Sequence, residues 1–257
     1  MIKLYNEEEI QVMRKGGEIL AKIMEELKKR VKPGITTKGL DKVASDLIFS
    51  AKGEFASGGK IQPSFKGFNN YPAVLCTSIN EEIVHGLPSE RKLKQGDILS
   101  LDLGIRFKGY CTDLAVTIPV GKVDKRVAEI IEVTKKALDI GIKQCKAGNS
   151  LNDIGSTIQK YVESQGFNVV RELCGHGIGK EVHEDPQILN YGGAPSSDGV
   201  KLKPGMVLAL EPMVVMGDWR IEKGKDGFSY KTKDNSLSSH FEHTIAITKK
   251  GPIILTR

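Results

Sequence analysis

An alternation of apolar and polar residues on both sides of Lys108-Gly109 constrains the fold of this chain more than any other feature of its sequence. Apolar side chains recur at every second position over residues 99–107 and again after the dipeptide, which is typical of half-buried strands. A two-residue turn at Lys108-Gly109 predicts a β-hairpin in which Leu103 faces Leu114. One face of this ribbon is wholly apolar, so a slip of one residue in register would expose it.

The other face of the predicted hairpin carries two aspartates inside the strands. The register places Asp102 opposite Ala115 and Asp113 opposite Gly104, so the two carboxylates are diagonal neighbours with Cβ atoms about 7–8 Å apart. Two divalent ions about 3.5–4 Å apart fit between carboxylates at this spacing. A solvated outer face is the alternative, because aspartate is depleted in strands without being excluded from them.

The composition is that of a globular protein without a membrane span. Of the 257 residues 39% are hydrophobic and 27% charged, and no apolar run approaches the roughly 20 residues of a membrane helix. The first residues also lack the apolar core of a signal peptide, so we expect a cytoplasmic protein. The four cysteines form no C-x-x-C pair, which suits reduced thiols. They are Cys76, Cys111, Cys145 and Cys174.

The net charge of +6 permits contact with nucleic acid or the ribosome. The lysines are scattered along the chain, however, and no basic helix is interleaved with aromatic residues. The charge pattern therefore favours a protein that binds no specific nucleic acid. A transient contact with the ribosome is left open.

The order of predicted elements repeats along the chain. Residues 7–30 and 127–145 both have helical periodicity. Each segment is followed by a corner with glycine and a hydroxyl residue, first Gly34 with Thr36 and then Gly148 with Ser150. A second helix follows each corner, to about residue 50 and to Gly166, and Ser150 begins a capping-box pattern. The repeat predicts two pseudo-symmetric halves, about 1–120 and 121–257, in one domain of residues 1–257 with the site in the cleft between them.

Strands are predicted to fill the rest of each half. In the first half, a glycine-containing loop with Gly58, Gly59, Pro63 and Gly67 precedes the strands. The predicted strands outside the hairpin span residues 73–78, 82–84, 169–173, 206–210, 213–216 and 241–248. These segments, together with four helices, predict a fold of the α/β or α+β class.

Two histidines in the second half lie in settings that favour a function. His176 has glycine on both sides within residues 174–179, which we expect to form a loop where the missing side chains let the backbone approach an imidazole closely. This glycine pattern lacks the spacing of a dinucleotide or phosphate loop. His183 lies just before a turn that we expect to end at Pro186. A structural role is the alternative for each histidine taken alone.

Two glutamates add to the set of ionisable groups on predicted strands. Glu211 ends the apolar run 206–210, and Glu242 lies within the strand predicted at 241–248. Burial of either without a partner is costly, although a salt bridge would also satisfy it. Four strand carboxylates and a neutral imidazole balance two divalent cations. Such oxygen-rich donors indicate Mn, Fe, Co or Zn rather than a thiolate zinc site.

Taken together, these motifs resemble type I methionine aminopeptidase of the pita-bread metallopeptidases. The resemblance covers nearly the whole chain in order, and it rests on His85 within residues 80–88, Asp102 and Asp113, the Gly-His-Gly-Ile-Gly run at 175–179, His183-Glu-Asp-Pro186, Glu211-Pro-Met213 and Glu242-His-Thr244. It implies a two-lobed pita-bread fold with a central curved, mainly antiparallel sheet and helices packed outside. The absence of an N-terminal extension and of a long insertion between His183 and Glu211 resembles the short bacterial form.

The resemblance also implies a chemistry. It implies removal of the initiator methionine from nascent polypeptides when the second residue is small, by metal-activated attack of water on the first peptide bond. Two divalent ions would be held by Asp102, Asp113, His176, Glu211 and Glu242, with Asp113 and Glu242 as bridging ligands. Glu211 would also shuttle the proton. His85 and His183 would lie on either side of the scissile amide and bind it. We expect a monomer whose partners are nascent polypeptide N-termini.

For the substrate side chain, the resemblance implies a pocket whose aromatic and sulfur contacts suit a thioether. Its members are Phe68, Tyr71, Cys76, Val182 and Phe228. Three of them differ from the residues expected in the family: Phe68 replaces tyrosine, Val182 replaces phenylalanine and Phe228 replaces tryptophan. These differences predict a wider tolerance of side chains. Core packing is the alternative for all five, and the favoured one for Cys76.

Two rival functions are considered. Prolidase and aminopeptidase P share the metal ligands but usually carry an additional N-terminal domain, for which we expect no room in this chain. A non-catalytic relative that binds the ribosome or RNA through a basic surface belongs to a different class of protein. Such relatives usually lose metal ligands, whereas all five are present here.

Overall fold

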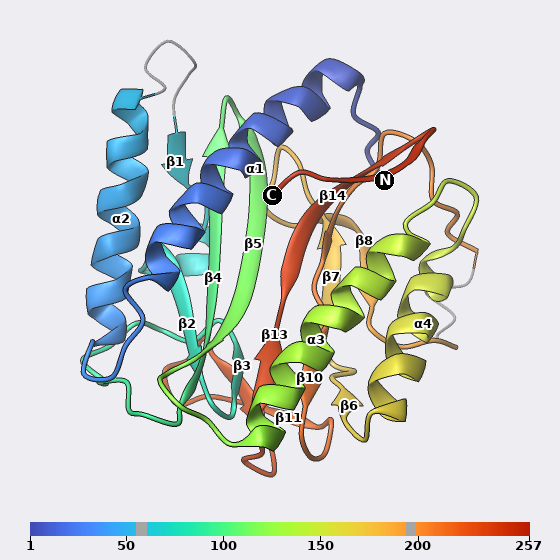
Figure 1. Ribbon diagram of the computed structural model, residues 1–257. Coiled ribbons are helices and arrows are strands. Elements are labelled where there is room, and N and C mark those ends of the chain that lie inside the picture. Colours follow the sequence, from blue (N-terminus) through green and yellow to red (C-terminus); the bar gives the residue numbers. More distant parts are fainter. Residues whose placement is uncertain (55–60, 194–198) are drawn as a thin grey trace.

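The computed structural model describes residues 1–54, 61–193 and 199–257 (Figure 1). The helices are α1 (Glu7–Lys28), α2 (Thr37–Glu54), α3 (Lys125–Gln144) and α4 (Leu151–Ser164), with a 3-10 helix, η1, at Phe68–Asn70. The strands are β1 (Ile61–Pro63), β2 (Leu75–Ile79), β3 (Glu82–Val84), β4 (Ile98–Phe107), β5 (Tyr110–Pro119), β6 (Asn168–Val169), β7 (Cys174–Gly177), β8 (Glu184–Leu189), β9 (Val207–Leu210), β10 (Met213–Val215), β11 (Ile221–Lys223), β12 (Tyr230–Thr232), β13 (Ser238–His240), β14 (Glu242–Thr248) and β15 (Gly251–Ile254).

The main sheet joins both halves of the chain. Its nine strands follow the order β1-β4-β5-β14-β9-β7-β8, with β2 paired to β4 and β15 paired to β14. Two smaller sheets have the orders β13-β10-β6 and β11-β12-β3. In Figure 1, α1 and α2 lie over the half of the main sheet that contains β4 and β5, and α3 and α4 lie over the half that contains β14 and β7. The helices and strands therefore form the layers predicted from the sequence.

The predicted hairpin is β4 and β5, with the predicted register. Leu103 pairs with Leu114, Asp102 with Ala115 and Gly104 with Asp113. The φ angles of Lys108 (49°) and Gly109 (89°) are both positive, as a two-residue hairpin turn requires. Apolar side chains of the hairpin pack against α1 and α2 in one hydrophobic cluster. The opposite face is thereby left for the two aspartates.

The helix boundaries follow from capping. The predicted capping box before α4 is present: Ser150 Oγ accepts from Asp153 N at 3.3 Å, and Asp153 Oδ2 accepts from Ser150 N at 2.7 Å. Asn6 and Glu9 form the same motif before α1. The helix predicted for residues 7–30 ends at Lys28, and the helix predicted to end near residue 50 continues to Glu54. None of the described helices is both long and apolar enough to cross a lipid bilayer.

Three segments differ from the sequence-based prediction. Residues 61–63 pair with β4 as strand β1 within the predicted loop, because Ile61 is fully buried against the apolar face. The turn expected at Pro186 is instead strand β8, in which Asp185 and Pro186 form a bulge opposite β7, and a proline is tolerated at a bulge. The strand predicted at 169–173 is reduced to β6. Gly58 and Gly59 of the predicted loop lie outside the described residues.

The glycine run around His176 is a strand rather than a loop. Strand β7 lies between β8 and β9, and its glycines are needed there for close packing. A Cβ at Gly175 would lie 2.5 Å from the carbonyl oxygen of Ala209, and one at Gly177 would lie 2.1 Å from that of Asp185. The glycines therefore allow close approach to neighbouring strands, whereas the sequence pattern suggested close approach to the imidazole.

Candidate active site

Strand pairing brings four acidic residues and a histidine together from distant parts of the chain. Ala115 pairs with Asp102 on one side and with Glu242 on the other, which forms one row across the sheet. Glu211 follows Leu210, the partner of His243, and so extends this row beside Glu242. Two positions further along the strands, and so on the same face, a second row runs from Asp113 through Thr244 and Ala209 to His176. Both rows cross strands from the two halves of the chain.

Hydrogen bonds fix the backbone of this centre. Asp113 N donates to Thr244 Oγ1 at 2.8 Å, and Thr244 Oγ1 donates to Asp113 O at 2.9 Å, so β5 and β14 are clamped together. Asn190 Nδ2 donates to Glu211 O at 3.0 Å and holds the end of β9. The side chains of Asp113, Glu211 and Glu242 are thus presented from a rigid scaffold.

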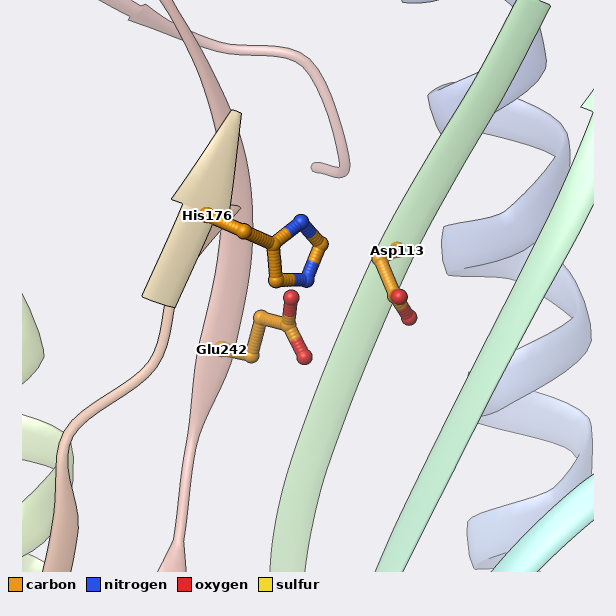
Figure 2. Close-up of side chains that lie close together, drawn as sticks. All are labelled: Asp113, His176 and Glu242. Atoms are coloured by element: carbon orange, nitrogen blue, oxygen red, sulfur yellow. The ribbon is translucent and has the colours of Figure 1, made fainter. Parts of the chain in front are cut away.

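The imidazole of His176 is oriented for coordination through one nitrogen. Its Nδ1 lies 2.9 Å from Gly177 O. A carbonyl only accepts, so Nδ1 carries the proton and Nε2 has a free lone pair. Nε2 is 3.5 Å from Glu211 Oε1. Figure 2 shows His176 and Glu242 converging on the same space with Asp113 across from them, and donor atoms of the three residues lie within 4.8 Å of one another.

Burial strongly perturbs the carboxylates. It raises the pKa of Glu211 to about 8, and burial together with the Glu211 charge raises the pKa of Asp113 to about 7. The pKa values of Asp102 and Glu242 are raised well above their ordinary values by burial and then by the Asp113 carboxylate. Four like-charged groups in one buried place are unfavourable unless a cation or protons neutralise them.

The donor set fits metal ions. Asp102 Oδ1 and Glu242 Oε1 are fully buried and have no hydrogen-bond donor among the described residues. Buried carboxylate oxygens in proteins normally have a polar or ionic partner, and a bound cation would be that partner for these two oxygens. Two groups of three residues are close enough to hold a metal ion. One is Asp113, His176 and Glu242, and the other is Glu211, His240 and Glu242.

All the residues predicted for the site line one cavity of about 120 Å³. They are Phe68, Tyr71, Cys76, His85, Asp102, Asp113, His176, Val182, His183, Glu211, Phe228 and Glu242. The lining combines the carboxylates and imidazoles with the aromatic residues Phe68, Tyr71 and Phe228. A polar cluster with an adjoining apolar wall can activate water and bind an apolar side chain in one place.

The apolar wall is held by ring contacts. Tyr71 and Phe228 meet edge to face with centroids 5.3 Å apart, and the Tyr71 hydroxyl donates to the carbonyls of Leu75 and Gly86 at 3.1 and 3.0 Å. Phe68 packs edge to face on His183 at 5.1 Å. Cys76 is buried in the same hydrophobic cluster and also lines the cavity. It therefore contributes to core packing and to the pocket.

Two further histidines face the cavity as neutral groups. Burial lowers the pKa of His85 to about 4, and burial also lowers the pKa of His183. At neutral pH each imidazole therefore carries one N–H donor and one lone pair. The ring of His183 lies 4.2 Å from that of His176, which places it directly beside the carboxylate cluster.

Sequence reasoning missed three residues around this centre. Phe65 and Asn69 line the cavity from the segment predicted as a glycine-containing loop, where no periodic signal marked them. His240 lies two residues before Glu242, and its Nε2 is 3.5 Å from Glu211 Oε2. Alternation along a strand puts His240 and Glu242 on one face, and that signal was present in the sequence.

The perturbed groups predict how the stability of the metal-free protein depends on pH. Below about pH 6.5 the unfolded chain protonates histidines that are held neutral in the fold, so the histidine contribution to stability rises with pH. From about pH 4.5 to 8 the folded chain retains protons on Glu211 and Asp113 that the unfolded chain has lost, so the carboxyl contribution falls as pH rises. The two contributions oppose each other below pH 6.5, and only the carboxyl contribution remains above it. We expect the Tm of chelator-treated protein, measured by calorimetry, to fall between about pH 6.5 and 8. A Tm that rises steadily to pH 8.5 would contradict the raised pKa values.

A curved antiparallel sheet with helices outside and a central cluster of carboxylates and imidazole defines a class, the metal-dependent hydrolases of the pita-bread fold. Residues 11–249 match metallopeptidase family M24. The chain is 47% identical to methionine aminopeptidase 1 of Bacillus subtilis, over 97% of this chain and 96% of that protein. It is 45% identical to the methionine aminopeptidase of Clostridium perfringens, over 100% and 99%. The chain therefore belongs to metallopeptidase family M24, and within it to the methionine aminopeptidases.

Solved structures agree with this placement. The crystal structure of methionine aminopeptidase from Thermotoga maritima superposes with a TM-score of 0.93 at 43% identity, and all of both chains is covered. Prolidase from Pyrococcus furiosus shares the fold, with a TM-score of 0.76 at 23% identity, and this chain covers 65% of it. The predicted pita-bread fold and the family resemblance are confirmed.

Proposed function

We propose that this chain removes the N-terminal methionine from polypeptides whose second residue is small, with divalent metal ions held in the central cluster. The observation that carries the proposal is the single cavity in which four buried carboxylates and His176 adjoin an apolar pocket. Full-length identity to proteins named methionine aminopeptidase supports the choice of substrate.

Two divalent ions suit the cluster best. Four ionised carboxylates balance two doubly charged cations, and Glu242 is close both to Asp113 with His176 and to Glu211. Oxygen and imidazole donors favour Mn, Fe, Co or Zn. When bound, such ions supply Lewis acidity that activates water and polarises the scissile carbonyl.

The residues of the chain perform the remaining steps. Glu211 accepts the proton of the attacking water and passes it to the leaving amine, because its carboxylate lines the cavity within the central cluster. His85 and His183 donate or accept hydrogen bonds at the scissile amide and at the oxyanion that develops from its carbonyl. The free α-amine of the substrate is positioned by the carboxylate cluster, which requires an unblocked N-terminus.

The apolar part of the cavity binds the methionine side chain. Thioethers pack well against aromatic edges, and Tyr71 and Phe228 present an edge-to-face pair there. Val182 is smaller than the phenylalanine expected at its position, and this difference leaves more room in the pocket. We infer that side chains other than methionine are accepted at a reduced rate.

The test is release of methionine from two peptides by chelator-treated protein. We expect no release before metal is added and release from Met-Ala-Ser after addition of Mn, Co, Fe or Zn. Release from Met-Leu-Ser should be at least about tenfold slower, because a narrow pocket for the second residue excludes a bulky side chain. Free methionine is measured by chromatography.

Controls separate this function from its rivals. An N-acetylated Met-Ala-Ser peptide should resist cleavage, because its α-amine is blocked. The dipeptide Ala-Pro should also resist cleavage, and its rapid hydrolysis would favour a prolidase. If no ion restores release and the protein binds RNA, the binding-protein alternative is correct.

We infer that the substrates in the cell are the N-termini of nascent polypeptides in the cytoplasm, where initiator methionine is exposed. The chain would act as a monomer, with at most a transient contact to the ribosome. The net charge of +6 supports such a contact with a polyanionic surface. Co-sedimentation with ribosomes at low and high salt would test this inference.

A further inference from the structure

One buried imidazole next to the carboxylate cluster is not used by the proposed mechanism. His240 is the last residue of β13, and its side chain is 2% exposed. Neither of its ring nitrogens has a hydrogen-bond partner among the described residues. Buried polar atoms normally have hydrogen-bond partners, so a buried imidazole without one indicates a functional role rather than a purely structural one.

The ring of His240 is directed at two of the proposed ligands. Its Nε2 lies 3.5 Å from Glu211 Oε2 and 3.9 Å from Glu242 Oε2. The other oxygen of Glu211, Oε1, lies 3.5 Å from Nε2 of His176, which carries a lone pair rather than a proton. His240 is therefore the imidazole of the two that can donate to Glu211.

The backbone of His240 is fixed, so the ring approaches Glu211 from a set direction. Thr117 Oγ1 accepts from His240 N at 2.8 Å and donates to His240 O at 2.8 Å. Thr117 Oγ1 is also 2.8 Å from Ser100 Oγ on the neighbouring strand. His240 is further paired with Met213, two residues after Glu211. The imidazole and the carboxylate are therefore held by adjoining strands.

His240 does not line the cavity that the five proposed ligands line. Its ring reaches Glu211 and Glu242, which do line that cavity. A residue that is not part of the cavity wall acts through the carboxylates that it adjoins.

We propose that His240 is a positioning residue, whose Nε2–H holds the Glu211 carboxylate in the orientation needed for metal binding and proton transfer. The inference rests on the proposed metal site and deepens it. The 3.5 Å between His240 Nε2 and Glu211 Oε2 is close enough for this hydrogen bond to form with a small shift of either side chain. Groups behind metal ligands typically change metal affinity or activity by about 10–100-fold when they are removed.

The experiment compares His240→Ala with His240→Gln. Glutamine places an N–H donor near the position of Nε2 but is a poor ligand for these metals. We expect His240→Ala to weaken Co(II) or Mn(II) binding, measured by calorimetric titration, by about 10–100-fold and His240→Gln to remain within about threefold of the parent. The kcat for Met-Ala-Ser should fall with His240→Ala at saturating metal, with KM little changed.

His243→Ala is the matched control. His243 is on the same chain segment but on the opposite side of the strand, where its Nδ1 contacts Thr256 Oγ1 at 2.9 Å. Its replacement should leave metal affinity unchanged, which separates loss of a buried imidazole in general from loss of this one. Melting temperatures of the metal-free variants show whether each is folded.

Two results would overturn the proposal. Unchanged metal affinity and kcat in folded His240→Ala would mean that His240 does not position Glu211. Equal losses in His240→Ala and His240→Gln, with loss of nitrogen coordination from the Co(II) absorption spectrum, would make His240 a direct ligand. Failure of the parent protein to bind metal would instead refute the proposed function, so the two failures are distinguishable.

Discussion

Asp113→Ala is expected to abolish methionine release, with kcat/KM reduced by on the order of 1000-fold or more, because it removes a ligand that the cluster needs to hold its ions. Calorimetric titration should show loss of at least one bound ion. The fold should persist, since Thr244 holds the backbone of residue 113 rather than its side chain. Turnover at the parent rate would refute the assignment of Asp113.

Asp113→Asn is a more specific test of the metal-ligand role, because it removes the negative charge of the side chain and keeps its size and shape. The amide oxygen can still accept from Leu114 N, as Asp113 Oδ1 does at 2.9 Å. The metal-free Asn variant should melt above the metal-free parent at pH 8, because it lacks a buried carboxyl that, with a pKa of about 7, is largely ionised at that pH next to Glu211. Lower metal affinity together with higher metal-free stability is the signature of a functional carboxylate. A variant that loses both would indicate a structural role for Asp113.

His85→Ala is expected to lower kcat by about 100–1000-fold while metal affinity changes little, because His85 acts on the scissile amide rather than on the ions. The histidine has a positive φ of 59°, a conformation that histidine adopts more readily than alanine does. We therefore expect a modest fall in Tm in addition to the kinetic effect. Stopped assays at saturating metal and substrate measure kcat directly.

His85→Asn separates these two effects. Asparagine tolerates positive φ better than alanine does, so the Tm should return toward that of the parent. The rate should stay low if the imidazole itself binds the amide. Loss of metal in either variant would place His85 among the ligands and contradict the proposed role.

The hairpin and its aspartates could be predicted because their geometry is local. The turn at Lys108-Gly109 and the alternation beside it set the register of Asp102 and Asp113 without help from the rest of the chain. Capping at Ser150 was likewise local, and the structure confirms it. The resemblance to methionine aminopeptidase rested on motifs in a fixed order, and it brought residues of both halves into one expected site.

Segments whose conformation depends on distant neighbours were predicted wrongly. Glycines at 175 and 177 suggested a loop, yet they form β7 because carbonyl groups of β9 and residue 185 lie too close for any side chain. Pro186 suggested a turn, yet strand β8 accommodates it at a bulge. His240 was overlooked, because an imidazole beside Glu242 in sequence gives no sign of facing Glu211, which is 29 positions earlier in the chain.

The sequence by itself determined the hairpin, the types of metal ligand and the family, because these depend on residue identity and spacing over short stretches. Only the tertiary structure decided that β9 and β14 pair, that Glu211 therefore lies beside Glu242, and that His240 adjoins both. The reason is physical. Pairing between remote strands is set by packing of the whole core, and the pKa of a buried carboxylate depends on which charges that packing brings near.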